Sequence, residues 1–135
     1  MVLIDIDIDD LHAILVYKIN DIFPIDIKLN KIVEYNIYND VNIHHIICNL
    51  RDVPHLKYIQ NKKMPYVNYM VTAGHFAGYG IEHSFENFDN LIKNFNYSND
   101  IKCKRMFGKI VIVDGVHRAA ILKSKNVKKI TCLIV

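Results

Sequence analysis

Apolar and polar side chains alternate along the first fifty residues, with β-branched runs between turn-forming residues. Residues 2–8 (VLIDIDI) show the two-residue period that is typical of a strand with one face in solvent. The stretches 13–19, 31–38 and 43–48 are rich in Ile, Val and Tyr and lie between Asn and Asp residues. We therefore expect a β-rich segment over residues 1–50.

Between residues 51 and 95 the pattern becomes helical. Asp52 followed by Pro54 predicts a helix start, because aspartate is a preferred cap and proline fits the first turn. Pro65 is expected to interrupt this helix, since proline lacks the N–H that an interior turn requires. A second short helix is then expected over residues 66–70.

A third helix is predicted after a glycine-rich loop at residues 73–80. Ser84 precedes apolar residues at the i, i+3, i+4 and i+7 spacing that places side chains on one helix face. Glu86 and Asp89 fall in its early turns, where negative charge suits the helix dipole. The apolar face consists of Phe85, Phe88, Leu91, Ile92 and Phe95.

The last third of the chain combines a strand, a turn, a helix and a strand. Residues 109–113 (KIVIV) are typical of a strand buried on both faces. The pair Asp114-Gly115 predicts a turn, residues 116–125 a helix, and residues 130–135 (ITCLIV) a closing strand. We expect these elements to form one unit.

Length and composition favour a single α+β domain over residues 1–135, because domains commonly hold about 100–200 residues. Apolar residues make up 51% and charged residues 23%, which excludes a disordered or fibrous chain. No apolar run approaches the ~20 residues of a membrane span, and the acidic start differs from a secretion signal. We therefore expect a soluble cytoplasmic protein without a membrane partner. An odd cysteine number without a CxxC pattern predicts buried reduced thiols at Cys48, Cys103 and Cys132.

Candidate chemistry gathers in the run Asp114-Gly115-Val116-His117-Arg118. A helix N-terminus carries about half a positive charge and unpaired N–H groups, so cationic side chains in its first turn are unfavourable. His117 and Arg118 make sense there if they converge with the backbone on an anion such as a phosphate. Gly115 would allow a close approach, and Asp114 could bind a divalent metal or accept a hydroxyl proton. The alternative is structural: Asp114 caps the helix, Gly115 turns the chain and Arg118 lies on the surface.

Residues 82–135, and above all the strand, DGVHR turn, helix and closing strand, resemble the C-terminal half of the ParB/sulfiredoxin-like fold. That resemblance implies a compact α+β domain with a small mixed sheet flanked by helices. The D-G-H-H-R motif of the free-serine-kinase branch is the most similar, because only its first histidine is replaced, by Val116. The reactive cysteine of sulfiredoxins would also fall on Val116, and the G-E-R-R pattern of ParB proteins is not met.

The resemblance to the kinase branch implies a role for each matching residue. Asp114 would assist deprotonation of a substrate hydroxyl or hold Mg²⁺. A second acidic residue would come from an earlier segment, either Glu86 or Glu82, although Glu86 could instead be a first-turn capping acid. The nucleotide-binding residues would be Gly115, Val116, His117 and Arg118.

A pattern around residues 51–55 and the loop that follows resembles small ParB-like proteins of surface-polysaccharide loci. It adds candidates for contact with an anionic substrate. These candidates are Arg51, His55 and His83, of which Arg51 and His55 could equally be surface residues.

We therefore expect a small-molecule kinase that moves a phosphoryl group from ATP or ADP, with Mg²⁺, to a hydroxyl of a free amino acid or sugar. The alternative is a ParB-like or DndB-like nucleotide-binding regulator associated with nucleic acid. A net charge of +3 is far below that of a DNA-binding module, so a nucleic-acid partner is not the first expectation. A nucleotide sensor or scaffold without catalysis is the third possibility.

Overall fold

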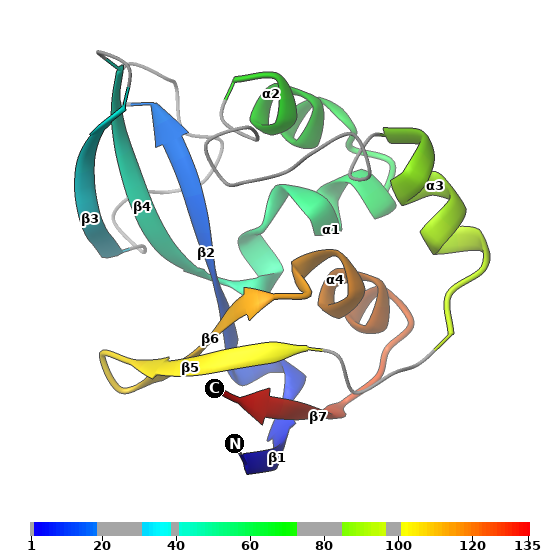
Figure 1. Cartoon of the computed structure of the whole chain (residues 1–135). Coiled ribbons are helices and arrows are strands. Elements are labelled where there is room, and N and C mark those ends of the chain that lie inside the picture. The colour runs from blue at the N-terminus through cyan, green and yellow to red at the C-terminus, as the bar shows by residue number, and fades with distance from the viewer. Residues whose placement is uncertain (1, 19–30, 39–40, 73–84, 97–100) are drawn as a thin grey trace.

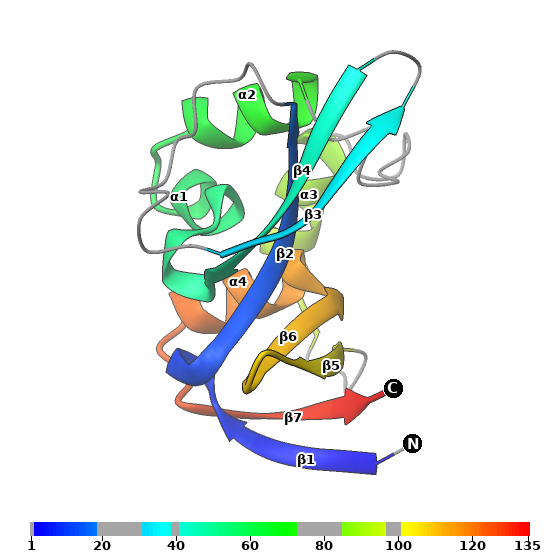
Figure 2. The same cartoon turned by 90° about the vertical axis from the view of Figure 1, so that its left-hand side faces the viewer.

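One sheet with α-helices on one side forms the described part of the chain, as two perpendicular views show (Figure 1 and Figure 2). The glycine-rich loop predicted at residues 73–80 falls outside it. The computed structural model describes residues 2–18, 31–38, 41–72, 85–96 and 101–135.

Seven strands make up the sheet. Their bounds are β1 Val2–Asp7, β2 Leu11–Lys18, β3 Lys31–Tyr38, β4 Val41–Asn49, β5 Lys102–Met106, β6 Lys109–Asp114 and β7 Lys129–Ile134. The spatial order is β1-β7-β5-β6-β2-β4-β3. The pairs β2–β6 and β5–β7 are parallel, and the other neighbours are antiparallel. The sheet is therefore mixed, and β6, which leads into the DGVHR turn, lies at its centre.

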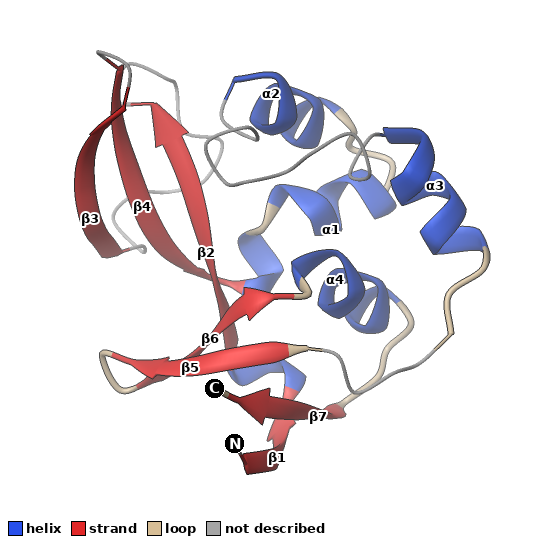
Figure 3. Cartoon of the chain, in the orientation of Figure 1, coloured by secondary structure: helices blue, strands red, loops and turns tan. Residues whose placement is uncertain are grey.

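Four α-helices among the described residues pack on one face of this sheet (Figure 3). Their bounds are α1 Pro54–Ile59, α2 Met64–Thr72, α3 Phe85–Lys93 and α4 Val116–Ser124. Two 3-10 turns, η1 (Ile8–Asp10) and η3 (Leu50–Asp52), join β1 to β2 and β4 to α1. The predicted α+β class is confirmed, and none of the described helices is long and apolar enough to cross a membrane.

Strand β5 is the element that the sequence pattern does not predict. Its sequence, KCKRM, offers Cys103 as the only fully buried side chain, so it shows neither a clear alternation nor an apolar run. Pairing with β6 on one side and β7 on the other holds this strand in the sheet instead. Tertiary context thus overrides a weak local signal.

The prediction that Pro65 interrupts a helix is wrong. Pro65 is the second residue of α2, where the backbone N–H has no partner within the helix in any case. The predicted helix start needs a correction as well. Val53 is the cap residue of α1 and Pro54 its first residue, whereas Asp52 belongs to η3.

The core fills the space between the sheet and the helices. Strand β6 contributes Val111 and Ile112, both fully buried, but Val113 is 41% exposed. The strand is therefore buried on both faces at its centre only. The prediction of reduced, buried thiols is confirmed, because Cys48, Cys103 and Cys132 are all free and buried. At Cys48 this burial raises the pKa to about 12.

Candidate functional site

The turn between β6 and α4 carries the residues predicted to hold an anion. Gly115 is the cap residue of α4 and has a left-handed backbone, with φ 111° and ψ 23°. A Cβ at this position would lie 3.2 Å from the Cα of Ile101, in addition to the strain that the positive φ imposes. The chain therefore requires glycine here for its own packing, whether or not a ligand approaches the turn.

Helix α4 begins without a side-chain cap. Asp114 is the last residue of β6, one position ahead of the cap residue, and it is exposed. The predicted alternative of Asp114 as helix cap is thus wrong. The first-turn N–H groups have no partner within the helix. Their partial positive charge lies at the N-terminal end of α4, which is also the end next to the Asp114 carboxylate.

Arg118 lies in the first turn of α4 and is partly exposed. A cation in this position is opposed by the helix dipole, so its presence costs a few tenths of a kcal/mol unless an anion is near. The turn therefore presents Asp114, the backbone of Gly115 and Arg118 on the outside of the molecule.

His117 occupies the interior, which corrects the prediction that it points at a phosphate. Its side chain is only 8% exposed, and its Nε2 lies 2.9 Å from the hydroxyl of Tyr66 in α2. The ring of Phe88 in α3 is 4.7 Å away and nearly perpendicular. One residue along a helix is a rotation of about 100°, so neighbouring His117 and Arg118 point in different directions.

His55 is fully buried, so the prediction that it contacts a substrate or lies on the surface is wrong. Its ring lies 4.5 Å from the His117 ring in a T-shaped arrangement. Helix α1, which carries His55, packs beside α4 and α2 on the helical side of the sheet, and this placement buries four of its six residues.

His55 and His117 belong to an aromatic cluster to which every described α-helix contributes. We define the aromatic cluster as His55, Tyr58, Tyr66, Phe88 and His117. Its rings lie about one ring width apart and mostly meet edge to face, the arrangement that aromatic quadrupoles prefer. The cluster fixes the first turn of α4 against the other three helices.

Tyr58 closes the outer side of the aromatic cluster. Its hydroxyl donates to Asp89 Oδ1 over 2.8 Å, its ring stacks on Phe88 at 5.2 Å, and Lys63 Nζ lies 4.3 Å from its ring centre. Burial, the hydrogen bond to Asp89 and the Asp89 charge raise the pKa of Tyr58 to about 12. The phenol therefore stays neutral at physiological pH and acts as a donor.

Glu86, the predicted second acidic residue, is exposed in the first turn of α3. Phe88, whose ring reaches His117, lies two positions further on, about 200° around the helix. The face of α3 that approaches α4 is therefore not the face that carries Glu86. The position supports the alternative reading of a first-turn acid that complements the helix dipole.

The remaining predicted residues are Arg51, His83 and Glu82. Arg51 is exposed in η3, where its Nε is 3.9 Å from Asp52 Oδ2. His83 and Glu82 fall outside the described residues. Within the described ranges no group of three or more His, Cys, Asp or Glu side chains could hold a metal ion.

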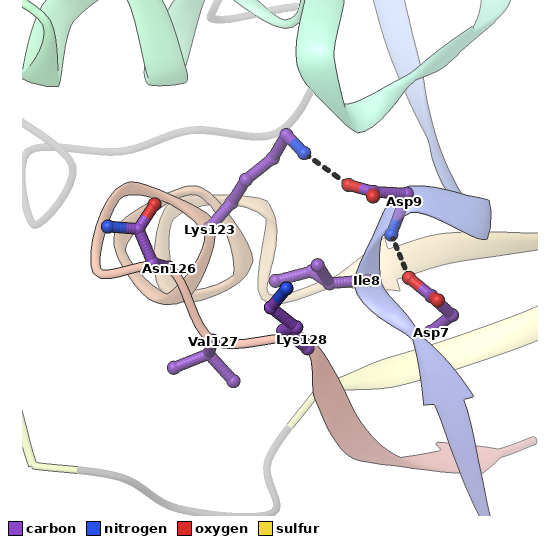
Figure 4. A pocket seen from close by; sticks show the side chains of 7 residues that line it. All are labelled: Asp7, Ile8, Asp9, Lys123, Asn126, Val127 and Lys128. Atoms are coloured by element: carbon purple, nitrogen blue, oxygen red, sulfur yellow. Dashed lines mark hydrogen bonds and ion pairs between the residues drawn. The ribbon is translucent and has the colours of Figure 1, made fainter.

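A polar groove of about 320 Å³ lies at the opposite end of α4 from the turn (Figure 4). Lys123 Nζ bridges to Asp9 Oδ1 over 2.6 Å across it. The hydrogen bond and the charge of Lys123 hold the pKa of Asp9 below its usual value. Asp7 accepts from the Asp9 N–H and so caps η1. These interactions tie η1 to α4, and none of the predicted site residues lines the groove.

The sequence does not predict that Tyr66 and Phe88 contact His117 in the interior of the protein. Phe88 is predicted as an apolar face residue, but nothing in the pattern pairs it with His117. Tyr66 lies 51 positions away from His117 in the chain, and the packing of both α2 and α4 against α1 brings the two together.

No protein-family model, no curated protein and no solved structure matches the chain.

Proposed function

We propose that the chain is a nucleotide-dependent phosphotransferase that binds nucleotide phosphates at the β6–α4 turn. The observation that carries the proposal is the outward face of this turn. An exposed carboxylate at Asp114, a helix N-terminus without a side-chain cap and the partly exposed Arg118 occur within five residues. Helix N-termini and arginine are the groups that proteins use to hold phosphate oxygens.

In the proposed reaction the protein supplies position and charge. Phosphoryl transfer requires little covalent chemistry from the enzyme, since its transition state spreads negative charge over phosphoryl oxygens. The acceptor hydroxyl oxygen forms the new O–P bond, its proton passes to the Asp114 carboxylate, and the P–O bond to the leaving nucleotide breaks. Arg118 and the first-turn N–H groups balance the charge of the phosphates.

Mg²⁺ would enter this reaction as the nucleotide complex. Mg²⁺ commonly binds through one or two carboxylates together with substrate phosphates and water. The single carboxylate of Asp114 would fit that requirement, in the alternative in which it holds Mg²⁺ instead of accepting the proton.

His117 has a supporting role in this proposal. Its hydrogen bond to Tyr66 and its ring contacts with His55 and Phe88 hold the first turn of α4 in place. It positions the backbone and Arg118 from within the protein and does not itself touch the phosphates.

A second candidate, a ParB-like nucleotide-binding regulator without phosphotransfer, is favoured by the same burial of His117. The outward face of the turn then offers one cationic side chain instead of two, which is enough for binding but leaves less charge stabilisation for chemistry. Turnover with an acceptor distinguishes the two candidates.

The test is a calorimetric titration with Mg²⁺-ATP and Mg²⁺-ADP. Arg118→Ala should weaken the affinity by about 10- to 100-fold, because the lost contact is a charge-assisted hydrogen bond. Lys125→Ala is the matched control, since it removes one positive charge from the other end of α4 and should leave the affinity unchanged. Equal affinities for wild type and Arg118→Ala would refute the site. If binding is found, free serine, threonine and sugars are then tested as acceptors.

A further inference from the structure

The hairpin of β5 and β6 ends in a tight turn that points away from the helices (Figure 1). Met106 pairs with Lys109, so that the loop consists of two residues, Phe107 and Gly108. Both have positive φ, 52° for Phe107 and 73° for Gly108, as a type I′ turn requires. Strand β7 pairs with β5 only at Lys102 and Cys103, and β2 pairs with β6 only at residues 110–112, so the tip, residues 106–109, projects beyond both neighbours as a two-stranded ribbon.

Phe107 is an unusual residue for this backbone position. The first loop residue of a type I′ turn is commonly Asn, Asp or Gly, because a bulky side chain is strained at positive φ. The other described non-glycine residues with positive φ are Asn61 and Asn126, of the type that tolerates it. Phe107 is also 55% exposed, so its ring is accessible to a ligand. Backbone strain of this kind clusters at binding and catalytic sites.

The hairpin that carries Phe107 is rich in positive charge. Lys104, Arg105 and Lys109 are exposed, and residues 101–113 contain no Asp or Glu. Lys104 lies opposite Val111 and Lys109 opposite Met106, so these two lysines share one face of the ribbon, and Arg105 takes the other. A ligand at the tip therefore meets cations on both sides of the ring.

We propose that the β5–β6 hairpin tip binds single-stranded nucleic acid, with one base stacked on Phe107 and the adjoining phosphates on Lys104, Arg105 and Lys109. A flat exposed ring beside cations is the arrangement that holds unpaired bases and their backbone. Duplex DNA offers no exposed base face, and a single aromatic ring inserts little apolar area into a membrane. These two arguments favour single-stranded nucleic acid as the partner.

This site is separate from the proposed nucleotide site. The tip lies before Lys109 and the nucleotide turn after Asp114, and the strand between them separates the two by about 17 Å. The inference therefore does not depend on the proposed phosphotransferase, and each can fail alone.

The test measures fluorescence anisotropy of a labelled 12-nucleotide single strand at low salt. We expect a dissociation constant on the order of 1–100 µM for wild type, weakening steeply with salt. Phe107→Asn should weaken binding by about tenfold or more, because it removes the stacking ring. The same variant should melt at the same temperature as wild type or higher, since asparagine suits the turn. Loss of binding therefore cannot come from loss of folding.

Matched variants locate the site and name the partner. Phe107→Tyr should keep the affinity, while Phe107→Leu should lose it. Lys104→Gln should reduce the salt dependence, whereas Lys125→Gln, with the same charge loss on α4, should not.

Three outcomes would overturn the proposal. The first is equal single-strand affinity of wild type and Phe107→Asn. The second is loss of that affinity in Arg118→Ala, which would move the strand to the nucleotide turn. The third is binding to vesicles of anionic phospholipid that Phe107→Leu preserves, without binding to the single strand, which would make the tip a membrane contact.

Discussion

The hydrogen bond between Tyr66 and His117 allows a direct test of the interior role of His117. Tyr66→Phe removes only the hydroxyl that lies 2.9 Å from Nε2, in a place where both side chains are buried. Net loss of a buried hydrogen bond costs about 0.5–1.5 kcal/mol, and desolvation of the remaining polar atom brings the range to about 1–3 kcal/mol. For a chain of this length, an unfolding entropy of about 2.1 cal/mol/K per residue converts this to a Tm lowered by roughly 3–11 °C.

Denaturant titration and thermal melting measure this effect, with Tyr58→Phe as the comparison. Tyr58 donates to the carboxylate of Asp89, which is exposed, so water can solvate this carboxylate once the phenol hydroxyl is removed. Loss of the Tyr58 hydrogen bond should therefore cost about 1 kcal/mol or less. Because His117 acts on the proposed nucleotide site only by holding the first turn of α4, Tyr66→Phe should weaken nucleotide affinity far less than Arg118→Ala does. A stability change below about 0.3 kcal/mol, or an affinity loss as large as that of Arg118→Ala in a folded variant, would refute the interior assignment of His117.

Three further predictions concern the turn and the cluster edge. Asp114→Asn should cut phosphotransfer turnover by roughly 10²–10⁴-fold with little change in Tm, because Asp114 is the proton acceptor of the proposed reaction but does not cap α4; turnover at the wild-type rate would leave it without a catalytic role. Gly115→Ala should destabilise the fold by about 1–3 kcal/mol in denaturant titration, since φ is 111° and Ile101 lies 3.2 Å from the added Cβ. The raised pKa of Tyr58 stabilises the fold fully below pH 10, and this stabilisation should disappear between pH 10 and about 12 as the phenol ionises. The Tyr58→Phe variant should lose less stability than wild type over that window, and parallel curves would contradict the assignment.

The sequence by itself determined most of the local structure. Alternation predicts β1, apolar spacing predicts α3, and the DGVHR run is correctly placed between a strand and a helix. These features depend on backbone geometry and on the period of side chains along an element, which neighbouring residues encode. The buried thiols also follow from cysteine number and spacing.

Only the tertiary structure decided which of the motif residues face outward. In α4 six of nine residues are buried, because helices cover one side and the sheet the other. A helix buried around most of its surface has no clear apolar stripe, so its sequence does not reveal that His117 points inward and Arg118 outward. The same reason hides the fully buried His55 in α1, where polarity suggests a surface residue.

The aromatic cluster and β5 illustrate the rest of what the tertiary structure decided. Tyr66 and His117 meet because α2 and α4 both pack against α1, and β5 forms because β6 and β7 offer edges on both of its sides. Both depend on contacts between segments far apart in the chain, for which a single sequence carries no local signal. The DG turn in the sequence thus predicts the backbone of the site, whereas the direction of each side chain is set by the residues that pack around it.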